Sequence, residues 1–107
     1  MSREHDDRND IRGIVFEWYP PKAQSNLKKH EVSFQEACTI FGDENILELP
    51  DRDHSEEELR FIGVGRSDRD RLLFVTFTVR SDKVRIISAR QAKSWERREY
   101  EIANRYE

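Results

Sequence analysis

The sequence predicts one small α+β domain, with two short helices near the start, three consecutive strands and a last helix. A length of 107 residues supports a single hydrophobic core. Hydrophobic residues make up 36% of the chain and occur in short runs, which favours a folded domain despite a charged content of 38%. The spacing within those runs changes from helical to alternating along the chain.

The first predicted strand spans about residues 12–18. Ile14, Phe16 and Trp18 alternate with other residues, as in a half-buried strand. Pro20-Pro21 ends this strand and can begin a helix. Over 22–30, the spacing of Ala23 and Leu27 predicts a short amphipathic helix.

A second helix is predicted at 34–41. Ser33 and Glu36 have the spacing of a capping box, in which each side chain bonds the backbone of the other residue. Gly42 stands where a helix is expected to stop. The helix carries an apolar stripe of Phe34, Ala37, Cys38 and Phe41.

The second half of the chain predicts an antiparallel meander. Apolar, β-branched runs at 59–66, 72–79 and 84–89 are separated by short polar turns, which favour antiparallel neighbours. Before them, a short apolar run at 46–49 precedes an acidic segment at 50–58 that is expected to be a surface loop. A last helix is expected to begin near Ser94.

Residues 1–10 are mostly charged and are predicted to be a disordered tail, which leaves 11–107 as the domain. The chain contains neither an apolar stretch that could span a membrane nor a signal-peptide pattern, so we expect a cytoplasmic protein with no membrane partner. Cys38 is the single cysteine and is expected to be a buried thiol.

Charge is distributed unevenly along the chain. Residues 1–58 hold 7 basic and 15 acidic side chains, whereas residues 59–107 hold 12 basic and 7 acidic ones. The basic part can attract phosphate, and the acidic part can limit nonspecific binding or meet a basic partner. Mixing of these charges in the folded protein is the alternative.

Four arginines interrupt the predicted strands, namely Arg60, Arg66, Arg85 and Arg90. An arginine in a strand needs water, an anion or a carboxylate. Its planar donors suit phosphate. Ion pairs with Glu58, Glu96 or Glu99 are the other interpretation.

Two histidines could exchange protons near neutral pH, His30 and His54. His30 could instead interact with the end of its helix, and His54 could form hydrogen bonds within the acidic loop. Because the histidines lack i,i+4 spacing and there is no cysteine cluster or Gly-rich phosphate loop, no metal and no cofactor are predicted.

A set of spaced motifs resembles the BrnT family, the toxin half of bacterial type II toxin–antitoxin pairs. The matching positions are Phe16-Glu17-Trp18, Lys22, Asn26, Lys29-His30, Val32-Ser33-Phe34, His54-Ser55, Arg60, Arg85 to Arg90, Glu96-Arg97 and Tyr100. Two positions depart from the pattern. Tyr19 stands where an Asp is usual, and Glu31 replaces a Gly that would ease a left-handed turn.

The resemblance implies a RelE-like fold, in which two N-terminal helices pack on one face of a twisted antiparallel sheet, with a C-terminal helix. It also implies metal-independent cleavage of RNA, growth arrest, and neutralisation by a DNA-binding antitoxin, BrnA, through which alone the toxin would reach operator DNA. Arg60, Arg85 and Arg90 would then act on the phosphate, His30 or His54 would carry protons, and Lys28, Lys29 and Arg66 would bind RNA. A noncatalytic subunit that binds a protein partner is the alternative.

Overall fold

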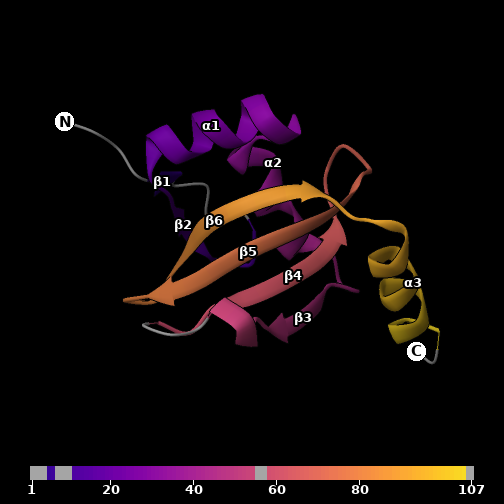
Figure 1. Cartoon of the computed structure of the whole chain (residues 1–107). Coiled ribbons are helices and arrows are strands. Elements are labelled where there is room, and N and C mark those ends of the chain that lie inside the picture. The colour runs from indigo at the N-terminus through magenta and orange to yellow at the C-terminus, as the bar shows by residue number, and fades with distance from the viewer. Residues whose placement is uncertain (1–4, 7–10, 55–57, 106–107) are drawn as a thin grey trace.

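A six-stranded sheet forms the centre of the structure, a computed structural model that describes residues 5–6, 11–54 and 58–105 (Figure 1). The strand order is β1-β2-β6-β5-β4-β3. The strands are β1 (His5–Asp6), β2 (Val15–Glu17), β3 (Leu47–Pro50), β4 (Phe61–Arg66), β5 (Leu72–Arg80) and β6 (Lys83–Gln91). Of the predicted tail at 1–10, only His5 and Asp6 lie within the described residues.

The predicted meander is confirmed, because β4, β5 and β6 pair in sequence as antiparallel neighbours. No helix or strand was predicted for the apolar run at 46–49. In the structure this run forms most of β3, which pairs antiparallel with β4. β2 runs parallel to β6, so the otherwise antiparallel sheet contains one parallel pair among its described strands. A parallel pair requires a long crossover connection, and the helices and the meander between β2 and β6 provide it.

Two helices follow β2, α1 (Pro20–His30) and α2 (Phe34–Cys38). The predicted second helix is α-helical only to Cys38 and continues as the 3₁₀ turn η1 (Thr39–Gly42). The Thr39 hydroxyl donates to the Glu36 carbonyl at 2.7 Å, a local bond that competes with helix continuation.

Only half of the predicted capping box is present. The Ser33 hydroxyl accepts from the Glu36 N–H at 3.0 Å. The Glu36 side chain does not return to Ser33, so that part of the prediction was wrong. Its carboxylate instead accepts from the Ser67 hydroxyl at 2.6 Å and from the Arg71 guanidinium, because it is buried and a nearby cation satisfies it.

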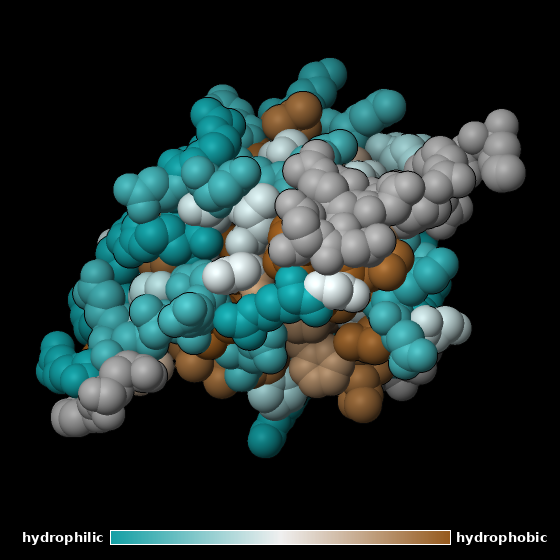
Figure 2. Space-filling view, turned by 180° about the vertical axis from the view of Figure 1, so that it is seen from behind, coloured by the Kyte–Doolittle hydropathy of each residue, from teal (hydrophilic) through white to brown (hydrophobic). Residues whose placement is uncertain are grey.

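The main core lies between one face of the sheet and the two N-terminal helices. Its fully buried side chains include Phe16, Val32, Phe34, Leu73 and Val75. The Cys38 thiol is buried there as predicted. Seen from behind in Figure 2, hydrophilic side chains cover most of the upper part of the molecule, where α1 lies.

The C-terminal helix α3 (Ser94–Ala103) covers one end of the opposite face. Tyr100 packs with Val64 and Leu72, and its hydroxyl donates to the Asp43 carboxylate at 2.7 Å. Among the described residues, no helix is both long and apolar enough to cross a membrane. The predicted α+β class and its three helices are present. None of the described helices covers the remainder of the sheet face beside α3, which we call the open face (Figure 1).

Candidate active site

An irregularity in β6 places the arginines on the open face. Thr78 pairs with Arg85 and Thr76 pairs with Ser88, whereas Phe77 pairs with Ile86, so Ile87 has no partner in the register. Side chains alternate along a regular strand, and Arg85 and Arg90, five residues apart, would point to opposite faces. The extra residue Ile87 restores them to one face, as a β-bulge does.

A groove runs along this open face. It has two parts with volumes of about 180 and 480 Å³, which share Lys22, Arg60 and Ile87. We call the combined surface the arginine groove. Its lining contains five cations, Lys22, Arg60, Arg80, Arg85 and Arg90, and three carboxylates, Asp51, Asp53 and Glu58. The excess of cations favours an anionic ligand.

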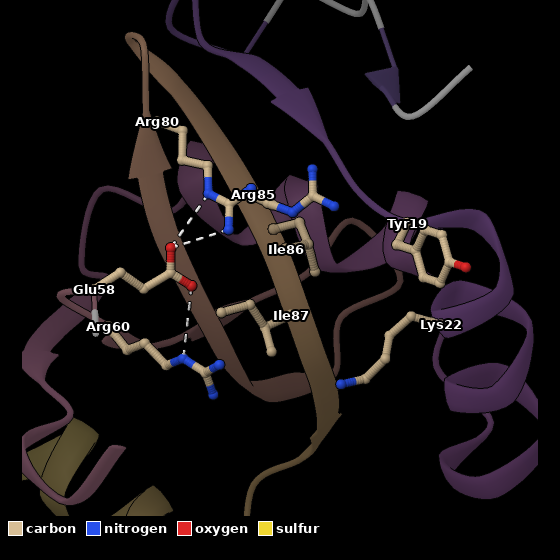
Figure 3. Close-up of a pocket in the computed structure, with 8 residues that line it drawn as sticks. All are labelled: Tyr19, Lys22, Glu58, Arg60, Arg80, Arg85, Ile86 and Ile87. Atoms are coloured by element: carbon tan, nitrogen blue, oxygen red, sulfur yellow. Dashed lines mark hydrogen bonds and ion pairs between the residues drawn. The ribbon is translucent and has the colours of Figure 1, made fainter. Parts of the chain in front are cut away.

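One wall of the arginine groove is organised around Glu58. Arg80 donates to a Glu58 oxygen from two nitrogens at 3.2 and 3.1 Å, and the Arg60 Nε lies 4.0 Å from the other oxygen. Lys22 and Tyr19 come from the start of α1 and form the opposite wall (Figure 3). Pro20 fixes this start, because its ring is preset for the first turn of a helix.

The other two arginines are each held by a carboxylate. Arg85 donates to Glu17 on the neighbouring strand β2 at 3.2 Å. Arg90 binds Glu96 through two nitrogens at 2.8 Å each, and its guanidinium lies 4.1 Å from the centre of the Phe74 ring. Burial opposes ionisation of Glu96, but the bonds from Arg90 and the Lys93 N–H lower its pKa below the ordinary value.

The structure brings together three predicted site residues, Arg60, Arg85 and Arg90. Ion pairs, which were the other interpretation of these arginines, also exist for all three. Arg85 pairs with Glu17, which was not among the expected partners. Their side chains are still 19 to 36% exposed. A ligand phosphate can therefore reach them by sharing or displacing a carboxylate.

Other predicted residues lie apart. Arg66 lies at the far end of β4, near Asp43 and Asp70, and lines neither part of the arginine groove. Lys28, Lys29 and His30 belong to the last turn of α1 and do not line it either. His54 ends the 3₁₀ turn η2 (Arg52–His54) beside Asp53, and its side chain lies outside what the structure describes.

Several polar and charged residues of the groove were not predicted as site residues, among them Tyr19, Lys22, Glu58 and Arg80 in one part and Asp51 and Asp53 in the other. Lys22 is one of the motif positions given above, so the sequence could have identified it as a candidate site residue. Glu58 and Arg80 are ordinary surface residues by sequence, since only the pairing of β4 with β5 brings them together.

A family model described as "Ribonuclease toxin, BrnT, of type II toxin-antitoxin system" matches residues 18–96, which is most of the chain and includes every arginine of the groove. The chain belongs to the BrnT family. The resemblance shown by the spaced motifs is thereby confirmed. A type II system pairs a toxin with an antitoxin, so an antitoxin partner and an RNA target follow from membership.

A solved structure supports the BrnT fold. The chain resembles the Brucella abortus ribonuclease toxin BrnT, known from a 1.1 Å crystal structure, with a TM-score of 0.57 and 21% sequence identity. The match covers 72% of this chain and 94% of that chain. At this identity it shows the fold alone. No curated protein matches the sequence.

The geometry defines what this BrnT-family groove can do. Several guanidinium groups around one hollow can bind phosphate and stabilise the extra charge of a pentacoordinate phosphorus. Carboxylates in the same hollow can accept a proton. Within the described part of the chain, no group of three His, Cys, Asp or Glu side chains is placed to hold a metal ion.

Proposed function

We propose that this BrnT-family toxin is a metal-independent endoribonuclease and that RNA is cut in the arginine groove. The observation that carries the proposal is the convergence of Arg60, Arg80 and Arg85 on one hollow of the open face. Family membership supplies the reaction class, a ribonuclease. The guanidinium groups supply positive charge that a metal ion provides in many other nucleases.

In the proposed step, the ribose 2′-oxygen attacks phosphorus while the bond from phosphorus to the 5′-oxygen breaks. Glu58 accepts the 2′-hydroxyl proton, and Lys22 donates a proton to the departing 5′-oxygen. Both side chains line the hollow, and Figure 3 shows them on opposite walls, as an in-line displacement requires. The products are a 2′,3′-cyclic phosphate and a free 5′-hydroxyl.

The histidines are rival proton carriers in this proposal. His54 follows Asp53, a groove residue, whereas His30 lies in the last turn of α1. Glu58→Gln should abolish most cleavage while RNA binding persists. Full activity in Glu58→Gln with a loss in His54→Ala would transfer the role of base to His54.

The decisive experiment is cleavage of purified RNA with EDTA present. Arg60→Ala and Arg85→Ala should each slow cleavage about 100-fold, a typical effect of losing one donor to the transition-state charge. Arg66→Ala is the matched control and should cleave normally, because its side chain lies outside the groove. Thermal unfolding checks that each variant is folded. Loss of wild-type cleavage in EDTA would refute metal independence.

A noncatalytic interaction subunit is the second candidate, and the pairing of Arg80 and Arg60 with Glu58 favours it. In that case the groove binds only an acidic partner. RNA binding without cleavage by the wild-type chain, at every RNA tested, would support this candidate.

The partner is proposed to be a BrnA-like antitoxin that binds DNA. The toxin would then reach operator DNA only through it. Co-purification of this chain with its antitoxin, followed by a gel-shift assay with operator DNA, tests the proposal. A shift by the toxin alone would contradict it.

A further inference from the structure

A second hollow on the open face lies between the sheet and α3. Its apolar lining comes from Leu47, Leu49, Ile62, Val64, Phe74 and Trp95, and its volume is about 100 Å³. We call it the apolar groove. Leu49 is 45% exposed and Trp95 is 57% exposed, although large hydrophobic side chains are costly to leave in water. Such a surface is typical of a contact site.

The apolar groove continues into the arginine groove. Both hollows are lined by Ile62 and Phe74, and Arg90 stacks on the ring of Phe74. A segment that lies along the open face would therefore meet apolar side chains first and cations next.

RNA is a poor occupant of the apolar groove. Among the described residues, this groove is lined by no cation, and its charged residues are Glu99 and the Glu96 that Arg90 neutralises, so it offers phosphate no partner. A second copy of the chain is the rival occupant, and the test below distinguishes it from the antitoxin.

We propose that the apolar groove binds an extended segment of the antitoxin, with apolar side chains at Leu49 and Trp95 followed by acidic side chains over the arginine groove. The charges of the arginine groove select the acidic part, and the apolar hollow supplies an anchor. The proposal rests on the proposed function for one point only, that the arginine groove is the active site. Bound in this way, the antitoxin would exclude RNA.

The test is the affinity of the purified antitoxin for variants of the toxin, measured by titration calorimetry. Leu49→Ala with Trp95→Ala should weaken binding at least about tenfold, as removal of an interface anchor does. Leu27→Ala is the matched control, because Leu27 is 49% exposed on α1, away from the groove. It should bind normally. Both truncated side chains are exposed, and thermal unfolding verifies the folded state.

A second measurement, RNA cleavage with and without the antitoxin, tests the docking site separately from the proposed function. The Leu49→Ala, Trp95→Ala toxin should cleave RNA at the wild-type rate and should resist inhibition by the antitoxin. If the wild-type toxin cleaves no RNA, the affinity measurement still decides the docking site. Wild-type affinity of the double variant would overturn the proposal. A toxin dimer that the double variant loses, without any change in antitoxin binding, would overturn it in favour of a second copy.

Discussion

Glu31 shows the consequence of a single departure from the family pattern. It follows α1 with a φ of 60° and a ψ of 32°, the left-handed conformation for which the pattern has glycine. Its N–H still donates to the Leu27 carbonyl at 2.8 Å, so the turn between α1 and α2 is kept. A side chain at such an angle meets steric strain that glycine avoids.

Glu31→Gly should therefore stabilise the protein by about 1 kcal/mol, since the relief of strain exceeds the added freedom of the unfolded chain. Urea unfolding measures the gain. Glu31→Ala is the control and should give none, because alanine keeps the Cβ atom. If Glu31→Gly and Glu31→Ala stabilise the protein equally, the gain comes from loss of the Glu31 charge and not from relief of backbone strain.

Glu36 is a buried carboxylate whose stability contribution depends on pH. Burial opposes its ionisation, but hydrogen bonds from Arg71 and Ser67 and the charge of Arg71 lower its pKa below the ordinary value of 4.5. Because the pKa of Glu36 is lower in the folded than in the unfolded protein, its ionised form stabilises the fold at pH values above the unfolded-state pKa. This contribution is lost as the pH falls through the folded-state pKa.

Glu36→Gln should cost about 2 kcal/mol at pH 7, because it removes a charged partner from Arg71. The difference between variant and wild type should shrink when pH falls from 5 to 3. Urea unfolding across this range measures it. A difference that stays constant down to pH 3 would show that the Glu36 charge contributes nothing.

At the scale of elements, α3 is held at both ends of its buried side. Glu96 in its first turn binds Arg90 of β6, and Tyr100 one turn later binds Asp43. Burial and the bond to Asp43 raise the pKa of Tyr100 to about 12, so its hydroxyl remains a donor at every physiological pH. The wall of the apolar groove depends on this anchoring.

Tyr100→Phe should cost about 1 kcal/mol and speed amide hydrogen exchange in α3 while β4 to β6 stay protected. Ile102→Ala is the control, because Ile102 is exposed on the same helix. Exchange rates in α3 that match the wild type would show that the hydroxyl bond does not hold the helix.

The helices and strands that could be predicted from the sequence are those whose pattern is set by residues close together in the chain. The turn at 81–82 is short and polar, so β5 and β6 had to be antiparallel. The position of Ile87 outside the register was not predictable, because nothing in the local sequence marks an extra residue. The convergence of Arg85 and Arg90 on one face depends on it. Lys22, Glu58 and Arg80 likewise meet only through long-range pairing.

At the scale of the whole molecule, the net charge of −3 hides a local excess of cations. The five cations of the arginine groove outnumber its three carboxylates. Attraction of RNA should therefore depend on salt, even though the protein as a whole is acidic.

Affinity for a single-stranded RNA that carries 2′-deoxy substitutions, and so cannot be cut, should fall as salt rises. Arg80→Ala should reduce the slope of log affinity against log salt by about 0.7, the value for one phosphate contact on a single strand. Fluorescence anisotropy from low to high salt measures the slope. Arg98→Ala, an exposed residue of α3, is the control and should leave it unchanged. An unchanged slope in Arg80→Ala would remove Arg80 from the RNA contact.

β6 is the last strand in the chain, yet it joins the β1-β2 pair to the strands β5, β4 and β3. During synthesis, α1, α2 and all earlier strands leave the ribosome before the strand that unites them, and only α3 follows it. For an interval during synthesis, the nascent chain therefore carries Arg60 and Arg80 but lacks β6, so the arginine groove is not yet formed. Antitoxin already present can meet the protein as it first becomes harmful.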